Sequence, residues 1–204
     1  SFVTAVEFAD VVKSRRMSRA FSQEAIAPSL FEECVDLAAR APSAGKSQGW
    51  SLLVLTEDET SQYWDIALPP EKRKGFAFPS LLNAPLVALV LADPHAYLSR
   101  YSEADKASTG LGESVDQWPA PYWTIDASFA TMTLLLALED RGVSSLFFAH
   151  AQEETLRESF GIPTHVQILG TIASGYAMSD QERKGRSASR ARRVASSVIH
   201  RSRW

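Results

Sequence analysis

Apolar residues recur at helical spacing in five parts of the chain. The 3.6-residue period predicts helices over residues 4–14, 28–41, 59–66, 124–141 and 153–160. Thr4 to Glu7 reads as a capping box, and Pro28 suits the first turn of a helix. The stretch 124–141 has almost no polar face before Glu139, so we expect this helix at the centre of the domain.

Four shorter apolar runs predict strands at residues 50–55, 86–92, 145–148 and 166–173. The run 86–92 is apolar without interruption, which is typical of a strand that is buried on both faces of a sheet. The chain contains neither an internal repeat nor a stretch of linker composition. We therefore expect a single domain over residues 1–204.

Two segments lack a clear period. Residues 93–121 are polar and irregular, and they are longer than connections in compact domains usually are, so we interpret them as a candidate lid. Residues 177–204 are too polar to form a core of their own, yet they end in Trp204. This combination indicates a C-terminal arm that packs on a partner surface.

The amino-acid composition indicates which class of protein this is. A hydrophobic content of 45% and a charged content of 22% are ordinary for a globular domain. The single cysteine, Cys34, excludes an internal disulfide and a cysteine zinc site, and its place on an apolar helix face favours a buried structural thiol over a nucleophile. We see no signal pattern and no apolar run near the roughly 20 residues of a membrane helix, so we expect a cytoplasmic protein with no membrane partner.

The net charge of −3 conceals an asymmetry. Residues 181–204 hold eight Lys or Arg and one Glu, which leaves 13 basic and 23 acidic residues in the first 180 positions. A basic tail is compatible with nucleic acid, but the acidic body would repel a polyanion, and the tail lacks the interleaved aromatic residues of single-strand binders. We therefore expect no nucleic-acid partner.

Common catalytic motifs are missing. Residues 40–47 end in Gly-Lys-Ser, but Arg40 stands where a P-loop needs glycine, and the helix–loop–strand order is reversed. Gly110 and Gly112 fall in the irregular segment, so a Rossmann site is disfavoured. The four histidines have no mutual spacing of two to four residues, so we expect no metal site, and His150 is either a structural histidine or a general base. This pattern favours an enzyme whose cofactor supplies the chemistry.

Three arginines cluster in Arg15-Arg16-Met17-Ser18-Arg19, where the first predicted helix ends. Cations at a helix C-terminus are often simply solvated. Alternatively, guanidinium groups bind phosphate through paired hydrogen bonds. The turn at residues 42–45 and the arginine-rich tail could complete such an anion site.

These residues also carry a resemblance. The stretch from Arg15 to Phe21, followed by Ala41-Pro42-Ser43-Ala44-Gly45-Lys46-Ser47-Gln48-Gly49-Trp50, resembles the opening of the FMN-dependent nitroreductase family. Further segments are similar to that family in order and spacing: Asp126 with the helix after it, 142–145, 156–157, 160–163, 169–176, 189–193 and 198–204. The similarity extends over essentially the whole chain.

The resemblance implies an α+β fold in which helices flank a central, mostly antiparallel sheet. It also implies an intertwined homodimer with FMN at the subunit interface and a C-terminal arm on the partner protomer. The activity implied is transfer of electrons from NAD(P)H through FMN to a nitroaromatic, quinone or enone acceptor. The implied cofactor-binding residues are Arg15, Arg16, Met17, Arg19, Pro42, Ser43, Ala44, Ala149, His150, Arg190, Arg192 and Arg193.

The resemblance leaves the electron donor and acceptor of the protein open. Trp118, Tyr122 and Trp123 are either aromatic walls for the substrate or ordinary packing residues. The sequence departs from the family pattern at Met17, Lys46, Gly49, Ala77, Ser80, Ala149 and His150. Two alternatives therefore remain: oxygen-dependent FMN fragmentation of the kind that makes the cobalamin lower ligand, and sequestration of flavin without turnover.

Overall fold

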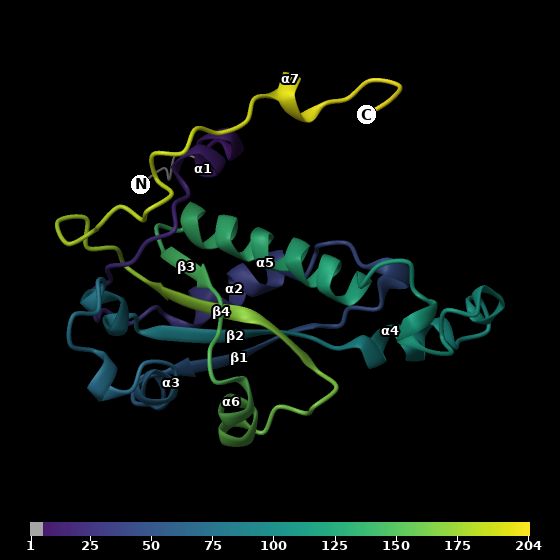
Figure 1. The fold of residues 1–204 in the computed structure, drawn as a ribbon, viewed down its shortest axis with the longest axis horizontal. Helices are drawn as coiled ribbons and strands as arrows, with labels where there is room; N and C mark the ends of the chain where they lie inside the picture. The colour runs from purple at the N-terminus through teal and green to yellow at the C-terminus, as the bar shows by residue number, and fades with distance from the viewer. Residues whose placement is uncertain (1–5) are drawn as a thin grey trace.

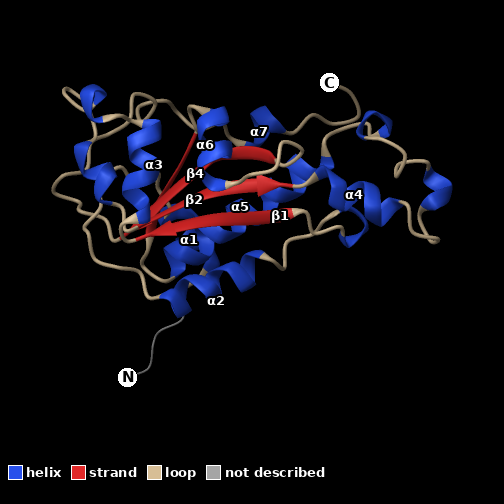
Figure 2. Cartoon of the chain, turned by 90° about the horizontal axis from the view of Figure 1, so that it is seen from below, coloured by secondary structure: helices blue, strands red, loops and turns tan. Residues whose placement is uncertain are grey.

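The computed structural model describes residues 6–204, so Thr4 of the predicted capping box lies outside it. Its centre is a four-stranded sheet in the order β1-β2-β4-β3 (Figures 1 and 2), and every neighbouring pair is antiparallel. The strands are β1 Trp50–Thr56, β2 Leu86–Ala92, β3 Ser144–Phe148 and β4 Gln167–Gly175. This confirms the expected α+β fold with an antiparallel sheet.

Helices cover both faces of the sheet (Figure 1). α2 and α5 pack together on one face, while α3 and α6 lie on the other. The helices are α1 Phe8–Ser14, α2 Pro28–Ala38, α3 Glu59–Ala67, α4 Pro94–Tyr101, α5 Tyr122–Asp140, α6 Glu153–Phe160 and α7 Ala195–Val198. Within residues 6–204, no helix is long and apolar enough to cross a membrane.

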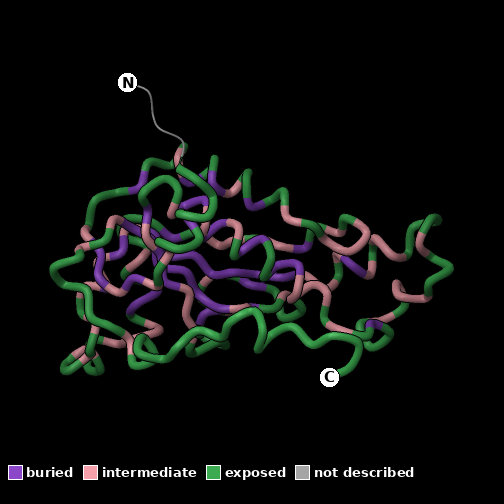
Figure 3. Tube along the Cα trace, turned by 90° about the horizontal axis from the view of Figure 1, so that it is seen from above, coloured by how far each residue is buried: buried purple, intermediate pink, exposed green. Residues whose placement is uncertain are grey.

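β2 explains why the sheet needs two helical layers. All seven of its residues are buried. Alternate side chains point to opposite faces of a strand, so Val87, Leu89 and Leu91 enter the core on the α3–α6 side. Leu86, Ala88 and Val90 enter the core on the α2–α5 side. The expectation of a strand buried on both faces is confirmed, and Figure 3 shows the buried positions gathered on the strands.

One pair of polar side chains is buried in the core on the α3–α6 side of the sheet. The hydroxyl groups of Tyr63 on α3 and Thr171 on β4 lie 2.8 Å apart, and both residues are fully buried. Burial raises the pKa of Tyr63 to about 12. The pair satisfies two polar groups that would otherwise be costly to bury, and it fixes α3 on the sheet.

Residues 93–121 are more ordered than their pattern indicated. They form α4 and two short 3₁₀ turns at Ala107–Thr109 and Val115–Gln117, and they extend beyond one end of the sheet (Figure 2). Asp93 caps α4, because its carboxylate accepts the backbone N–H of His95 at 2.9 Å, and Pro94 occupies the first turn. This Asp-Pro start is a recognisable helix signal.

The C-terminal arm runs away from the body of the domain (Figure 1). From Ser179 onward every residue is exposed except the half-buried Gly185, and Figure 3 shows this exposure along the arm. The arm is tied to the body near its start, where the N–H of Met178 donates to the carbonyl oxygen of Ala20 at 3.0 Å. An extended arm is therefore present, whereas its place on a partner protomer remains a prediction.

Candidate cofactor site

The arginine segment lies along the free edge of β3, the outer strand of the sheet. Met17 forms a parallel bridge with Ser145, and the N–H of Ser18 donates to the carbonyl oxygen of Ser145 at 3.0 Å. The N–H of Phe147 donates to the sulfur of Met17 at 3.4 Å. These contacts hold residues 17–18 as a short extra strand, which fixes Arg15 and Arg16 at the edge of the sheet.

Arg15, Arg16 and Met17 line a narrow crevice together with Leu135, Glu139 and Ser145, and in this structure it has no room for a water molecule. We call it the arginine cleft. The Nη1 atom of Arg15 is buried there and has no hydrogen-bond partner within residues 6–204. A buried cationic donor without a partner is costly, and a phosphate oxygen would satisfy it with a charge-assisted hydrogen bond. The guanidinium groups therefore have the chemistry to bind the phosphate of a cofactor such as FMN, and the crevice would have to open to admit it.

Glu139 is the one acidic residue that lines the arginine cleft. Its carboxylate opposes an incoming phosphate, although the two arginines leave the cleft with a net positive charge. We expect Glu139→Gln to bind FMN about two- to fivefold more tightly, as measured by quenching of flavin fluorescence. Asp140→Asn is the matched control, because Asp140 is exposed and lies outside the cleft; an equal gain in both variants would contradict a local effect.

Arg19 borders a different pocket of about 320 Å³, which residues 77–80 and 180–183 also line. Its guanidinium lies 5.4 Å from the centre of the Phe78 ring and donates to the carbonyl oxygen of Met17 at 3.1 Å. The backbone N–H of Arg19 donates to the carboxylate of Glu182 at 2.8 Å. The structure thus brings Arg19 next to the segment 77–80.

The turn at Pro42, Ser43 and Ala44 is held by residues from α4 and α5. The buried carboxylate of Asp126 accepts the N–H of Ala44 at 2.9 Å and the hydroxyl of Tyr97 at 2.7 Å. Burial and the bond to Asp126 raise the pKa of Tyr97, which keeps this hydroxyl a donor. Sequence reasoning marked Asp126 only by resemblance and did not predict this role.

α4 makes a second contact with the same turn. The Nε of Arg100 donates to the carbonyl oxygen of Gly45 at 2.7 Å, and Asp105 fixes the other side of that guanidinium. Gly45 has a positive φ of 59°, and a Cβ there would lie 2.8 Å from the ring of Tyr101. The turn therefore requires glycine at this position for both its backbone conformation and its packing.

The turn and the arginine cleft contact opposite ends of α5. Asp126 holds the turn, while Glu139 lines the cleft. Asp126 and Glu139 are 13 positions apart on the helix, which corresponds to about 20 Å at 1.5 Å per residue. Within one protomer, therefore, the structure does not bring Pro42, Ser43 and Ala44 to the arginine cleft.

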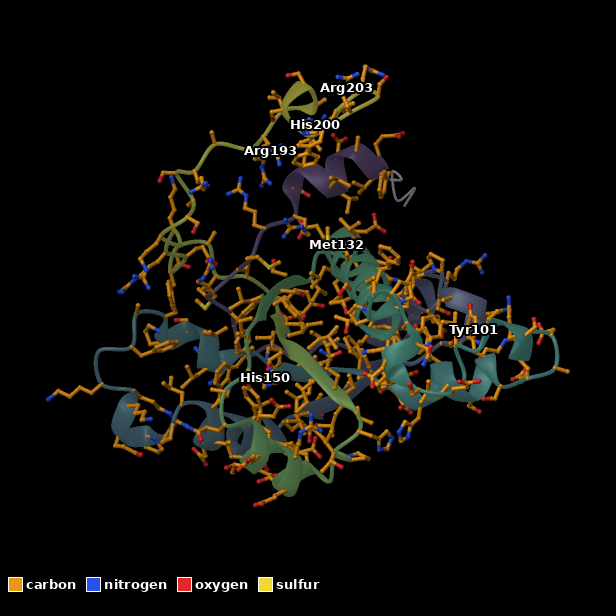
Figure 4. The ribbon with its side chains drawn as sticks, turned by 45° about the vertical axis from the view of Figure 1, so that its right-hand side comes forward. Tyr101, Met132, His150, Arg193, His200 and Arg203 are labelled. Atoms are coloured by element: carbon orange, nitrogen blue, oxygen red, sulfur yellow. The ribbon has the colours of Figure 1, made fainter. Side chains whose placement is uncertain are left out.

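Ala149 and His150 follow the C-terminal end of β3. The imidazole Nε2 of His150 lies 3.3 Å from a carboxylate oxygen of Glu153, and Arg157 donates to the other oxygen at 2.7 Å. Arg157 first, and then His150, lower the pKa of Glu153. In Figure 4 the labelled His150 lies on the α6 side of β3. These contacts favour the structural role for His150 over that of a general base.

The remaining predicted residues lie outside the arginine cleft. Arg190, Arg192 and Arg193 are exposed on the arm, and none of them lines the cleft. Arg193 donates to the carbonyl oxygen of Ser197 on the arm itself, and Figure 4 shows it on the arm, away from the sheet. Their predicted closure on the phosphate would require a different position of the arm.

Trp118, Tyr122 and Trp123 form one aromatic cluster with Tyr97 and Tyr101. Trp118 is buried at the centre of the cluster, and its indole N–H donates to the carbonyl oxygen of Leu111 at 2.8 Å. These contacts support the packing alternative for Trp118. Tyr122 and Trp123 are half-buried, and their contact with a substrate stays a prediction.

Known proteins are similar to this chain in sequence and in fold. The family model described as Nitroreductase family matches residues 12–176. A protein of Archaeoglobus fulgidus, whose name pairs NADH dehydrogenase with NAD(P)H nitroreductase, is 28% identical over 84% of this chain and 86% of its own. A 4-nitrobenzoate reductase of Nocardioides is 28% identical over 83% of this chain and 80% of its own.

The fold comparison extends further along the chain than the sequence matches. A protein of Exiguobacterium sibiricum, described as a nitroreductase and solved in complex with FMN, covers 98% of this chain and 99% of its own. The TM-score is 0.71 at 18% sequence identity, so this likeness concerns the fold alone. With the family model covering most of the sequence, the chain belongs to the nitroreductase family.

Proposed function

We propose that this protein is an FMN-dependent oxidoreductase that takes electrons from NAD(P)H and passes them to a nitroaromatic, quinone or enone acceptor. The observation that carries the proposal is the buried Nη1 of Arg15 at the edge of β3, which has no hydrogen-bond partner in the part of the chain that the structure describes. The names of the relatives, which include NAD(P)H nitroreductase and 4-nitrobenzoate reductase, support this class of donor and acceptor.

In this proposal the chain binds and orients the cofactor. Arg15 and Arg16 hold the phosphate, and Met17 contributes its backbone and its packing on β3. Arg19 provides a fixed positive charge toward the pyrimidine end of the flavin, where reduction places negative charge. FMN, when bound, supplies the two-electron chemistry that links the nicotinamide to the acceptor.

We also propose a homodimer, and α5 provides the first argument. Its sequence is apolar on nearly all sides, yet Phe129 is 49% exposed and Met132 is 40% exposed. Phe8 and Val12 on the neighbouring α1 are exposed as well. An apolar surface of this kind is typical of a protein–protein interface, and Figure 4 shows Met132 on the side of α5 that faces α1. A second protomer would cover it and would bring its own 42–44 turn to the arginine cleft.

The arm provides the second argument for the dimer. Val194, Val198, Ile199 and Trp204 are exposed on it, although apolar side chains are normally buried. A groove of about 580 Å³ between α2 and the edge strand β1 is lined mostly by apolar residues, among them Phe31, Trp50, Leu52 and Val54, with Glu32 and Asp36 also on its wall. In the proposed dimer, the arm of one protomer lies on the other and buries these side chains.

The proposal is tested by a visible absorption spectrum of the purified full chain. We expect a yellow protein whose flavin band bleaches when NADH or NADPH is added without oxygen, and recovers when 4-nitrobenzoate is added. A protein that remains colourless after incubation with FMN would overturn the cofactor assignment. A yellow protein that neither nicotinamide bleaches would contradict the proposed donor and would support flavin sequestration instead.

A further inference from the structure

Two histidines and an aspartate from separate segments meet at one end of the sheet. Ala92, the last residue of β2, pairs with Gln167, the first residue of β4. Asp93 directly follows the first of these residues, and His165 shortly precedes the second. With His95 on the first turn of α4, they place one ligand atom each within 4.8 Å of one another.

The distances within this cluster suit a metal ion. Two ligand atoms that are each about 2.1 Å from a tetrahedral ion lie roughly 3.4 Å apart. Asp93 Oδ1 and His165 Nε2 are already 3.6 Å apart. The imidazole rings of His95 and His165 are parallel, with their centres 4.0 Å apart. Because the lone pair of each imidazole nitrogen lies in the plane of its ring, the stacked rings do not point at one position, and the exposed rings would have to turn out of the stack to bind a common ion.

The backbone around the cluster is fixed on both sides. The N–H of Asp93 donates to the carbonyl oxygen of Gly49 at 2.9 Å, and Pro94 follows. On the other side, the carbonyl oxygen of Pro163 accepts Arg157 at 2.7 Å and the N–H of Val166 at 3.1 Å. The side chains of His165 and Asp93 are 39% and 36% exposed, so an ion can reach them. The positions are thus held by hydrogen bonds while the ligand atoms stay accessible.

We propose that Asp93, His95 and His165 bind one borderline divalent cation of the Zn²⁺ class, with water completing the coordination. Two imidazole nitrogens and one carboxylate oxygen are a ligand set that such ions prefer. The site shares no residue with the arginine cleft and does not depend on flavin. The local spacing of the histidines predicted no metal site, because His165 reaches the cluster only through the pairing of β2 with β4.

A bound ion would join the start of α4 to the loop before β4. α4 carries Tyr97 and Arg100, which hold the 42–45 turn through Asp126 and Gly45. An ion that binds the folded chain and not the unfolded one stabilises the fold by mass action. The site therefore stabilises the segment that positions the turn.

The test is calorimetric titration of the FMN-saturated full chain with ZnCl₂ after removal of metals with a chelator. We expect saturation near one equivalent per chain, and an affinity that falls at least about tenfold in His165→Ala. His200→Ala is the matched control, because His200 is also an exposed histidine that stacks on an aromatic ring, that of Trp204, but lies on the arm. His95→Ala provides a second ligand variant if His165→Ala folds poorly.

A spectroscopic measurement identifies the ligands independently. With one equivalent of Cu²⁺, the electron paramagnetic resonance spectrum of the wild type should show coupling to two imidazole nitrogens. His165→Ala should lose one of these couplings while His200→Ala keeps both. The proposal is overturned if Zn²⁺ does not saturate near one equivalent, or if His165→Ala and His95→Ala both titrate like the wild type.

Discussion

Arg15→Ala is expected to weaken FMN binding by about 10- to 100-fold, because a charge-assisted hydrogen bond to the phosphate is lost. The Nη1 of Arg15 is the buried donor that lacks a partner in the arginine cleft. Alanine removes this donor and one of the two positive charges that offset Glu139. Fluorescence titration of the flavin-free chain with FMN measures the effect directly.

Two variants separate the role of the guanidinium from a general loss of charge. Arg15→Lys keeps the charge but not the forked donor geometry, so we expect an intermediate affinity. Arg73→Ala makes the same change at an arginine that binds Asp65 and the carbonyl oxygen of Leu68 outside the cleft. FMN affinity equal to that of the wild type in Arg15→Ala would show that the phosphate binds elsewhere.

The sequence predicted most of the fold because the elements have strong local signals. The predicted strand 86–92 is β2, and the predicted apolar helix 124–141 is α5. Both are long apolar runs whose hydrophobic pattern indicates a single type of element. The ends of some elements differ from the prediction. α2 stops at Ala38, three residues before its predicted end, and β4 spans Gln167–Gly175 instead of 166–173. α4 was missed because its apolar spacing is weak, although Asp93 and Pro94 marked its start.

The site was only partly predictable, and distance along the chain is the reason. Arg15 and Arg16 are adjacent in sequence, so their shared cleft could be expected. Asp126 reaches Ala44 across 82 positions, and no local pattern reports such a contact. His95 and His165 likewise meet only when β2 pairs with β4. Arg19 was assigned by resemblance, and the structure adds its neighbours Phe78 and Glu182.

The second large effect is expected in Asp126→Ala. One oxygen of this buried carboxylate accepts both the N–H of Ala44 and the hydroxyl of Tyr97. Alanine leaves two donors without a partner, which should lower the free energy of unfolding by about 2–4 kcal/mol. For a domain of this size the melting temperature should fall by about 10 °C at fixed protein concentration. Thermal unfolding followed by circular dichroism provides the measurement.

Conservative variants test whether the hydrogen bonds are the cause. Asp126→Asn retains a carbonyl oxygen that can accept both donors, so it should lose much less stability than Asp126→Ala. Tyr97→Phe removes one donor and leaves the bond to Ala44, so its loss should also be smaller than that of Asp126→Ala. If Asp126→Asn melts as early as Asp126→Ala, the carboxylate charge and not the acceptor geometry holds the turn. In the proposed dimer this turn covers the flavin of the other protomer, so Asp126→Ala should also weaken FMN binding while Arg15 remains in place.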